Sequence, residues 1–70
     1  MSFVVEIASV PDRDGLVAEI WYGDDMVAEI QRDPKGGFTL EIYPSESSTH
    51  WLFDLQAWIA ALELAQRRLV

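Results

Sequence analysis

The stretch from Leu16 to Gln31, LVAEIWYGDDMVAEIQ, decides the fold of this chain. It contains the tetrapeptide Val-Ala-Glu-Ile twice, ten residues apart, on either side of Gly23-Asp24-Asp25. Apolar and polar residues alternate in both halves and a glycine-containing turn signal separates them, which is typical of a β-hairpin. We therefore predict two antiparallel strands here. Their pairing determines which residues of the neighbouring strands share a face.

Two further predicted strands flank this hairpin, at residues 2–9 and 38–43, where apolar residues again alternate with others. The sequences PDRDG at 11–15 and DPKGG at 33–37 supply the proline, glycine and aspartate that turns favour. Pro44 ends the last strand. Keeping the apolar side chains on one face and the loops short predicts the register through three directly opposed pairs: Ile7 with Ala18, Tyr22 with Met26, and Arg32 with Phe38.

The C-terminal part of the chain predicts one helix, from about Leu55 to Leu69. Asp54 is placed to act as its N-cap, because its carboxylate can accept amide hydrogens of the first turn. Phe53 and Trp58 have the spacing of a hydrophobic staple. The apolar residues that recur at helical spacing form one stripe, which consists of Leu55, Trp58, Ile59, Leu62, Ala65 and Leu69.

These elements predict an α+β fold: a four-stranded antiparallel meander sheet with one C-terminal helix packed on one face, as a single small domain over residues 1–70. Trp51-Leu52-Phe53 is either a short fifth strand or a plug over the core. We expect Trp58 and Leu62 to be buried against the sheet. The sheet residues expected to face the helix are Phe3, Val5, Ile7, Leu16, Ala18, Ile20, Met26, Ala28, Ile30, Leu40 and Ile42.

The composition excludes several classes of partner. The 70 residues include 12 acidic and 5 basic ones, which gives a net charge of −7. Affinity for nucleic acid or for anionic membrane depends on Lys and Arg, so we expect neither partner. The chain has no cysteine, and its first residues, MSFVVEIASV, do not have the pattern of a signal peptide. We therefore expect a cytoplasmic protein with no disulfide.

The predicted register places four glutamates in one row across all four strands, on the face away from the helix. A second predicted row on that face consists of Val4, Trp21, Val27 and Tyr43. The glutamate row can be a solvated strand face whose members splay apart, or an acidic strip that meets a basic protein or a cation. The candidate partner-binding residues are Glu6, Glu19, Glu29, Glu41, Trp21, Val27 and Tyr43.

No combination of residues predicts catalysis or a cofactor. His50 is the only histidine, and the neighbouring Ser48, Thr49 and Asp54 do not supply the positioned base and oxyanion hole of a hydrolase. A flat row of carboxylates rarely encloses a metal ion. We therefore predict that the chain is not an enzyme and has no metal site and no cofactor.

The segment Asp12 to Ile20, DRDGLVAEI, resembles a strand of HicB-type antitoxins over this short length. The turn and helix that follow in that family are replaced here by a third strand, so we infer neither membership nor any site residue. The sequence favours a small acidic protein-interaction module that makes contact through the open sheet face. The alternative is an antitoxin or immunity-type inhibitor of a basic partner, and a metal-dependent accessory protein or small enzyme comes third.

A homodimer is also compatible with the sequence. If one forms, we expect contact through the open sheet face around Trp21 and Tyr43. The other expected contact is the outer surface of the helix, formed by Ala57, Ala60, Ala61 and Leu64.

Overall fold

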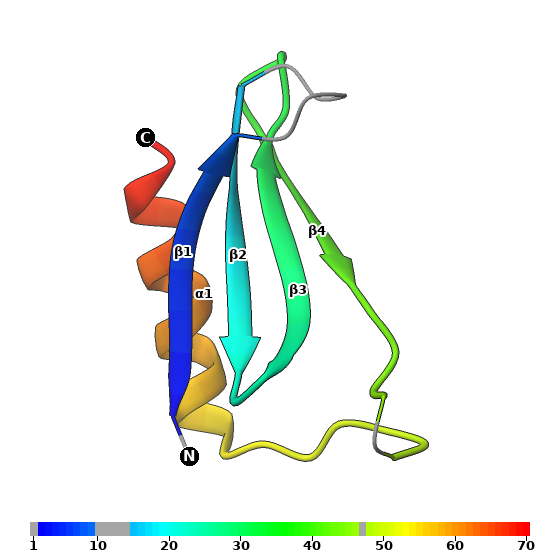
Figure 1. Ribbon diagram of the computed structural model, residues 1–70. Helices are drawn as coiled ribbons and strands as arrows, with labels where there is room; N and C mark the ends of the chain where they lie inside the picture. Colours follow the sequence, from blue (N-terminus) through cyan, green and yellow to red (C-terminus); the bar gives the residue numbers. More distant parts are fainter. Residues whose placement is uncertain (1, 10–14, 47) are drawn as a thin grey trace.

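The computed structural model describes residues 2–9, 15–46 and 48–70 of the chain. It confirms the predicted ββββα fold, with strand order β1-β2-β3-β4 in one antiparallel sheet and a single helix behind it (Figure 1). Of the first predicted turn, residues 11–14 lie outside the described residues. The elements are β1 (Phe3–Ser9), β2 (Leu16–Tyr22), β3 (Asp25–Arg32), β4 (Phe38–Ile42) and α1 (Leu55–Arg68).

The β2–β3 connection is one residue shorter than predicted. Tyr22 pairs with Asp25, and Gly23 has a φ of 64°. A two-residue loop with glycine at a positive φ in its first position is the type II′ geometry that suits the twist of a hairpin. The predicted pairing of Tyr22 with Met26 is therefore wrong, because Met26 lies opposite Trp21.

A β-bulge then restores the predicted pairing further along the hairpin. The register shifts between Ile20 and Trp21, so that Ile20 pairs with Ala28 and Val27 is the extra residue of β3. The turn favours one register, and the alternation of apolar residues favours a register one residue away. The bulge satisfies both, and it explains why the sequence pattern predicts the middle of the hairpin correctly and its end incorrectly.

The two other predicted pairs are confirmed, since Ile7 lies opposite Ala18 and Arg32 lies opposite Phe38. The β3–β4 turn closes through a hydrogen bond of 2.9 Å from the amide of Gly36 to the carbonyl oxygen of Asp33. Gly36 has a φ of 95°, a conformation that a side chain would strain.

The helix begins as predicted. Asp54 is its N-cap, and its carboxylate accepts a hydrogen bond of 3.0 Å from the amide of Ala57. The rings of Phe53 and Trp58 stack with their centroids 5.6 Å apart, which confirms the staple. The segment before the helix is a plug and not a fifth strand. Ring contacts join it to the sheet and the helix in one aromatic cluster, which consists of Phe3, Tyr22, Trp51, Phe53 and Trp58.

The helix packs on β1 and β2, and its buried stripe is rotated from the predicted one. Ala61 and Ala65 are buried, whereas Trp58 and Leu62 are only partly buried. Small side chains allow the helix to approach the sheet closely, which leaves larger neighbours at the sides of the contact. The core comprises Val5, Ala18, Ile20, Ile30, Ala61 and Ala65, with Phe3, Trp58, Leu62, Leu64 and Leu69 packed against it.

This rotation corrects the predicted outer surface of the helix. Ala61 is buried and Leu64 packs against the core, whereas Ala57 and Ala60 are exposed. Conversely, Leu55 and Ile59 of the predicted buried stripe are 64% and 39% exposed. The helix carries two adjacent apolar sectors, and the alanine sector is the one that faces β1.

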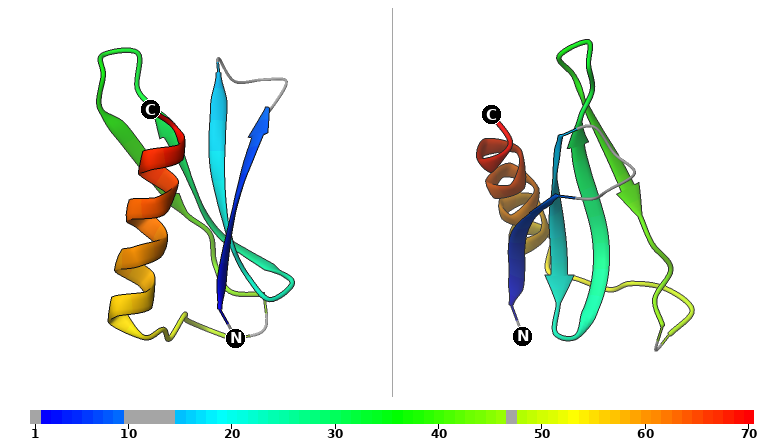
Figure 2. Two further views of the ribbon diagram at one scale, coloured as in Figure 1. Left: turned by 90° about the vertical axis from the view of Figure 1, so that its left-hand side faces the viewer. Right: turned by 45° about the horizontal axis from the view of Figure 1, so that its top comes forward.

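The helix does not cover the whole sheet, because the sheet twists and β4 diverges from the helix axis (Figure 2). Phe38, Leu40 and Ile42 belong to the face that the helix packs on, yet they remain 36%, 42% and 56% exposed. The prediction that Leu40 and Ile42 pack under the helix is therefore wrong, and so is the prediction for Leu16, which is 52% exposed.

Candidate functional site

The glutamate row exists as predicted. Glu6 lies opposite Glu19, Glu19 opposite Glu29, and Glu29 opposite Glu41. Ala18 and Ile20, the neighbours of Glu19, belong to the core under the helix, so the row lies on the other face of the sheet. Directly opposed carboxylates repel one another, which makes this arrangement unfavourable in the absence of compensating contacts.

The four glutamates differ in their exposure to water. Glu6 and Glu41 on the edge strands are exposed, and Glu19 is partly buried. Glu29 is only 8% exposed. The row therefore presents two accessible ends and a partly covered middle.

Two aromatic residues hold the inner carboxylates in place. The indole Nε1 of Trp21 donates a hydrogen bond of 3.2 Å to Oε1 of Glu19. The hydroxyl of Tyr43 donates one of 2.8 Å to Oε1 of Glu29 and one of 3.3 Å to Oε1 of Glu41. Trp21 and Tyr43 are both partly exposed and lie on the same face, as the sequence predicts.

Tyr43 spans the boundary between β3 and β4. Its backbone amide donates a hydrogen bond of 2.8 Å to the carbonyl oxygen of Val27, while its hydroxyl reaches Glu29 two residues further along β3. Partial burial of the phenol, together with the neighbouring carboxylates of Glu29 and Glu41, raises the pKa of Tyr43 to about 12. Both carboxylates favour the neutral, hydrogen-donating phenol over its anion.

The predicted second row is only partly correct. Trp21 lies opposite Val4, but its partner on β3 is Met26 and not Val27, because of the bulge. Val27 is fully buried, so it does not present a contact surface to a partner. Among the candidate residues, Val27 is therefore corrected to a structural role, whereas Trp21 and Tyr43 remain accessible.

A shallow hollow lies beside Glu6, at the β1 end of the glutamate row and near the β2–β3 turn. It is lined by Val4, Glu6, Trp21, Gly23 and Asp24. Two carboxylates beside an indole ring form a surface that attracts a cationic group. The alternation of residues does not predict this hollow, because Gly23 and Asp24 belong to the turn and not to a strand.

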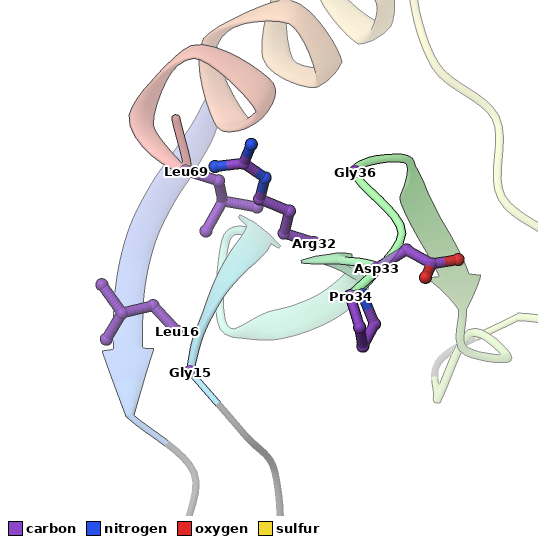
Figure 3. A pocket seen from close by; sticks show the side chains of 7 residues that line it. All are labelled: Gly15, Leu16, Arg32, Asp33, Pro34, Gly36 and Leu69. Atoms are coloured by element: carbon purple, nitrogen blue, oxygen red, sulfur yellow. The ribbon is translucent and has the colours of Figure 1, made fainter.

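A second hollow also carries two carboxylates beside an indole, because Asp24 and Asp25 line it together with His50 and Trp51, but no glutamate of the row lines it. Two further hollows in the described part of the chain lack such a pair of carboxylates. One lies between the helix C-terminus and the β3–β4 turn, and its lining includes Leu16, Arg32 and Leu69, with Leu69 beside the Arg32 side chain (Figure 3). Asp33 points away from that hollow, and its Oδ1 accepts a hydrogen bond of 2.8 Å from the amide of Lys35. Neither the lining of this hollow nor the hydrogen bond of Asp33 indicates a catalytic site.

Among the described residues, His50 makes no contact that would position it as a catalytic base. His50 is exposed, and its Nδ1 lies 3.1 Å from Oγ1 of the adjacent Thr49. The Asp54 carboxylate caps the helix, so it is engaged elsewhere. Within residues 2–9, 15–46 and 48–70, no group of three or more His, Cys, Asp or Glu residues is arranged to hold a metal ion.

Comparison with known proteins adds no identity to this geometry. No protein-family model, no curated protein and no solved structure matches the chain. No helix of the described residues is both long enough and apolar enough to span a lipid bilayer. The functional argument therefore depends on the residues of the sheet face themselves.

Proposed function

We propose that this chain is a non-enzymatic protein-interaction module whose glutamate row binds a basic protein. The observation that carries the proposal is the direct opposition of four glutamates across all four strands. Like charges placed opposite one another oppose folding. A positively charged partner removes that penalty, so binding and relief of repulsion act in the same direction.

The aromatic residues support recognition by positioning the carboxylates before a partner arrives. Trp21 holds Glu19 and Tyr43 holds Glu41 through their hydrogen bonds, so these two accessible carboxylates lose little freedom on binding. The ring of Trp21 borders the hollow that Glu6 and Asp24 line. A lysine or arginine side chain fits this hollow chemically, with its charge near the carboxylates and its stem against the indole.

The net charge of −7 supports the same function at longer range. An acidic surface accelerates encounter with a basic protein, and this acceleration decreases as ionic strength rises. We expect the affinity for the partner to fall with added salt, mainly through the association rate.

Affinity capture from the native cell tests this function. The bait carries Glu6→Gln and Glu41→Gln together, at the two exposed ends of the row. The matched control carries Glu46→Gln and Glu63→Gln, which remove the same number of charges from exposed positions outside the row. We expect the wild type and the control to retain the same basic protein and the row variant to lose it. Equal loss from both baits would show that net charge alone drives the capture. The identity of the captured protein also separates a general interaction module from an antitoxin or immunity-type inhibitor.

A further inference from the structure

The two edge strands of the sheet, β1 and β4, differ in their contacts with the rest of the chain. On β1, the guanidinium of Arg68 donates a hydrogen bond of 2.9 Å to the carbonyl oxygen of Val5. On β4, none of the described strands pairs with the outer side, and Figure 1 shows β4 at the outer edge of the sheet. A free edge presents a row of N–H and C=O groups that can pair with another strand.

The register identifies which groups of β4 face outward. The amide of Tyr43 bonds to Val27 of β3, so Tyr43 and every second residue before it direct their backbone groups toward β3. The intervening residues direct their N–H and C=O groups to the free edge. These intervening residues are Phe38, Leu40 and Ile42, whose apolar side chains also remain uncovered by the helix.

We propose that β4 pairs antiparallel with β4 of a second copy of this chain, about a two-fold axis at Leu40. This register opposes Leu40 to Leu40 of the second copy and Phe38 to Ile42 of the second copy. All three outward residues then form hydrogen-bonded pairs, so each copy donates three N–H groups and accepts three. The Phe–Ile pairs also unite aromatic and β-branched side chains, a combination that stabilises antiparallel strands.

The negative charge of Glu41 favours the register centred on Leu40 over the register centred on Glu41. Centred on Leu40, the pairing places Glu41 opposite Thr39 of the second copy, whose hydroxyl can donate a hydrogen bond. Centred on Glu41, the pairing would place two glutamates directly opposite one another. The strand thus complements itself in the register that uses its full length.

The resulting dimer is a continuous, open eight-stranded sheet with two-fold symmetry. Its two-fold axis is perpendicular to the sheet, so both helices lie on one face and both glutamate rows lie on the other. The outer edges are then the two β1 strands, which Arg68 blunts at Val5, so further growth is disfavoured. β4 has only 5 residues. Pairing two such strands buries less surface than the about 1,200 Å² at the lower end of stable interfaces, so we expect a transient dimer.

Sedimentation velocity from about 10 µM to about 1 mM protein tests the association itself. We expect the mean sedimentation coefficient of the wild type to rise with concentration, and to rise more in high salt because each copy carries a net charge of −7. Leu40→Lys should raise the dissociation constant at least about tenfold, since it places two ammonium groups opposite one another. The matched control is Leu52→Lys, at a loop leucine that is 85% exposed, and it should behave as the wild type. A wild type that remains monomeric at every concentration overturns the proposal, as does a dimer that Leu40→Lys leaves intact.

Disulfide trapping tests the register. The chain has no cysteine, so Thr39→Cys and Glu41→Cys introduce single thiols. The proposed pair of these positions is non-hydrogen-bonded, with Cα atoms about 4.5 Å apart, which is within disulfide reach. Mixing the two variants under mild oxidation should give more mixed disulfide than the statistical share. Cross-linking that favours either variant with itself contradicts the Leu40-centred register.

Discussion

The hydroxyl of Tyr43 donates a hydrogen bond of 2.8 Å to Oε1 of Glu29, a carboxylate that is only 8% exposed. This contact ties the end of β4 to the centre of the sheet. It also supplies a donor to the most buried member of the glutamate row, where a carboxylate without compensation would be unfavourable. The stability of the glutamate row therefore depends on Tyr43, which lies just after the last residue of β4.

We predict that Tyr43→Phe lowers the free energy of unfolding by about 1–3 kcal/mol at neutral pH, because it removes a donor from a buried charged acceptor. Chemical denaturation measures this loss. The control is Tyr22→Phe, which removes the hydroxyl of the tyrosine on the helix side. Glu29→Gln should reduce the effect of Tyr43→Phe in a double-mutant cycle, and full additivity of the two changes would contradict the coupling.

Alkaline titration should reveal the same contact. The pKa of Tyr43 is raised to about 12, so the folded state holds this proton more tightly than the unfolded chain, whose tyrosine pKa is about 10. The stabilisation from the neutral phenol is fully present below pH about 10 and is lost as pH rises toward about 12. Tyrosinate absorbance of the Tyr22→Phe variant isolates Tyr43, and a midpoint near 10 in the folded protein would contradict the structure.

We predict that Glu19→Gln stabilises the isolated protein by about 0.2–1 kcal/mol at neutral pH. The change removes one of the opposed charges, and the amide oxygen can still accept the hydrogen bond from Trp21. The gain should be larger at low salt, where repulsion is least screened. Thermal denaturation at two ionic strengths measures it, with Glu63→Gln on the exposed face of the helix as the control. Destabilisation by Glu19→Gln would mean that the opposed carboxylates do not oppose folding.

The close approach of the helix to the sheet gives a packing prediction. Ala65 is fully buried, so Ala65→Leu should destabilise the fold by about 1–3 kcal/mol through overpacking. Gln56 is exposed on the same helix, and Gln56→Leu should change the free energy of unfolding by less than about 0.5 kcal/mol. Similar effects at both positions would show that the alanine sector does not face β1.

Strand alternation and the glycine-containing turns are sufficient to predict the four strands and the glutamate row. The helix start is predicted by Asp54, a capping residue that precedes an apolar stripe at helical spacing. The bulge at Val27 could not be predicted, because Met26 and Val27 are both apolar and either can follow the turn. The rotation of the helix about its axis could not be predicted either, because its leucine side and its alanine side are both apolar. Only the packing of the helix on the sheet shows that Ala61 and Ala65 are the residues buried in the core.

The hydrogen bonds that brace the row could not be predicted from spacing alone. Alternation places Trp21 and Tyr43 on the correct face, but the direction of a long side chain depends on its rotamer. The sequence therefore predicts which residues meet on this face, whereas the structure shows which of them remain accessible to a partner.

NMR titration of the protein with a hexalysine peptide tests the central claim that the glutamate row is a binding surface. The account predicts that the Trp21 indole N–H signal and the amide signals of Glu6, Glu19 and Glu41 shift together. Glu19→Gln should weaken the binding, even though it stabilises the free protein, and Glu63→Gln should leave the binding unchanged. Shifts centred on Glu46 and Glu63, or equal affinity in the wild type and Glu19→Gln, would contradict the claim.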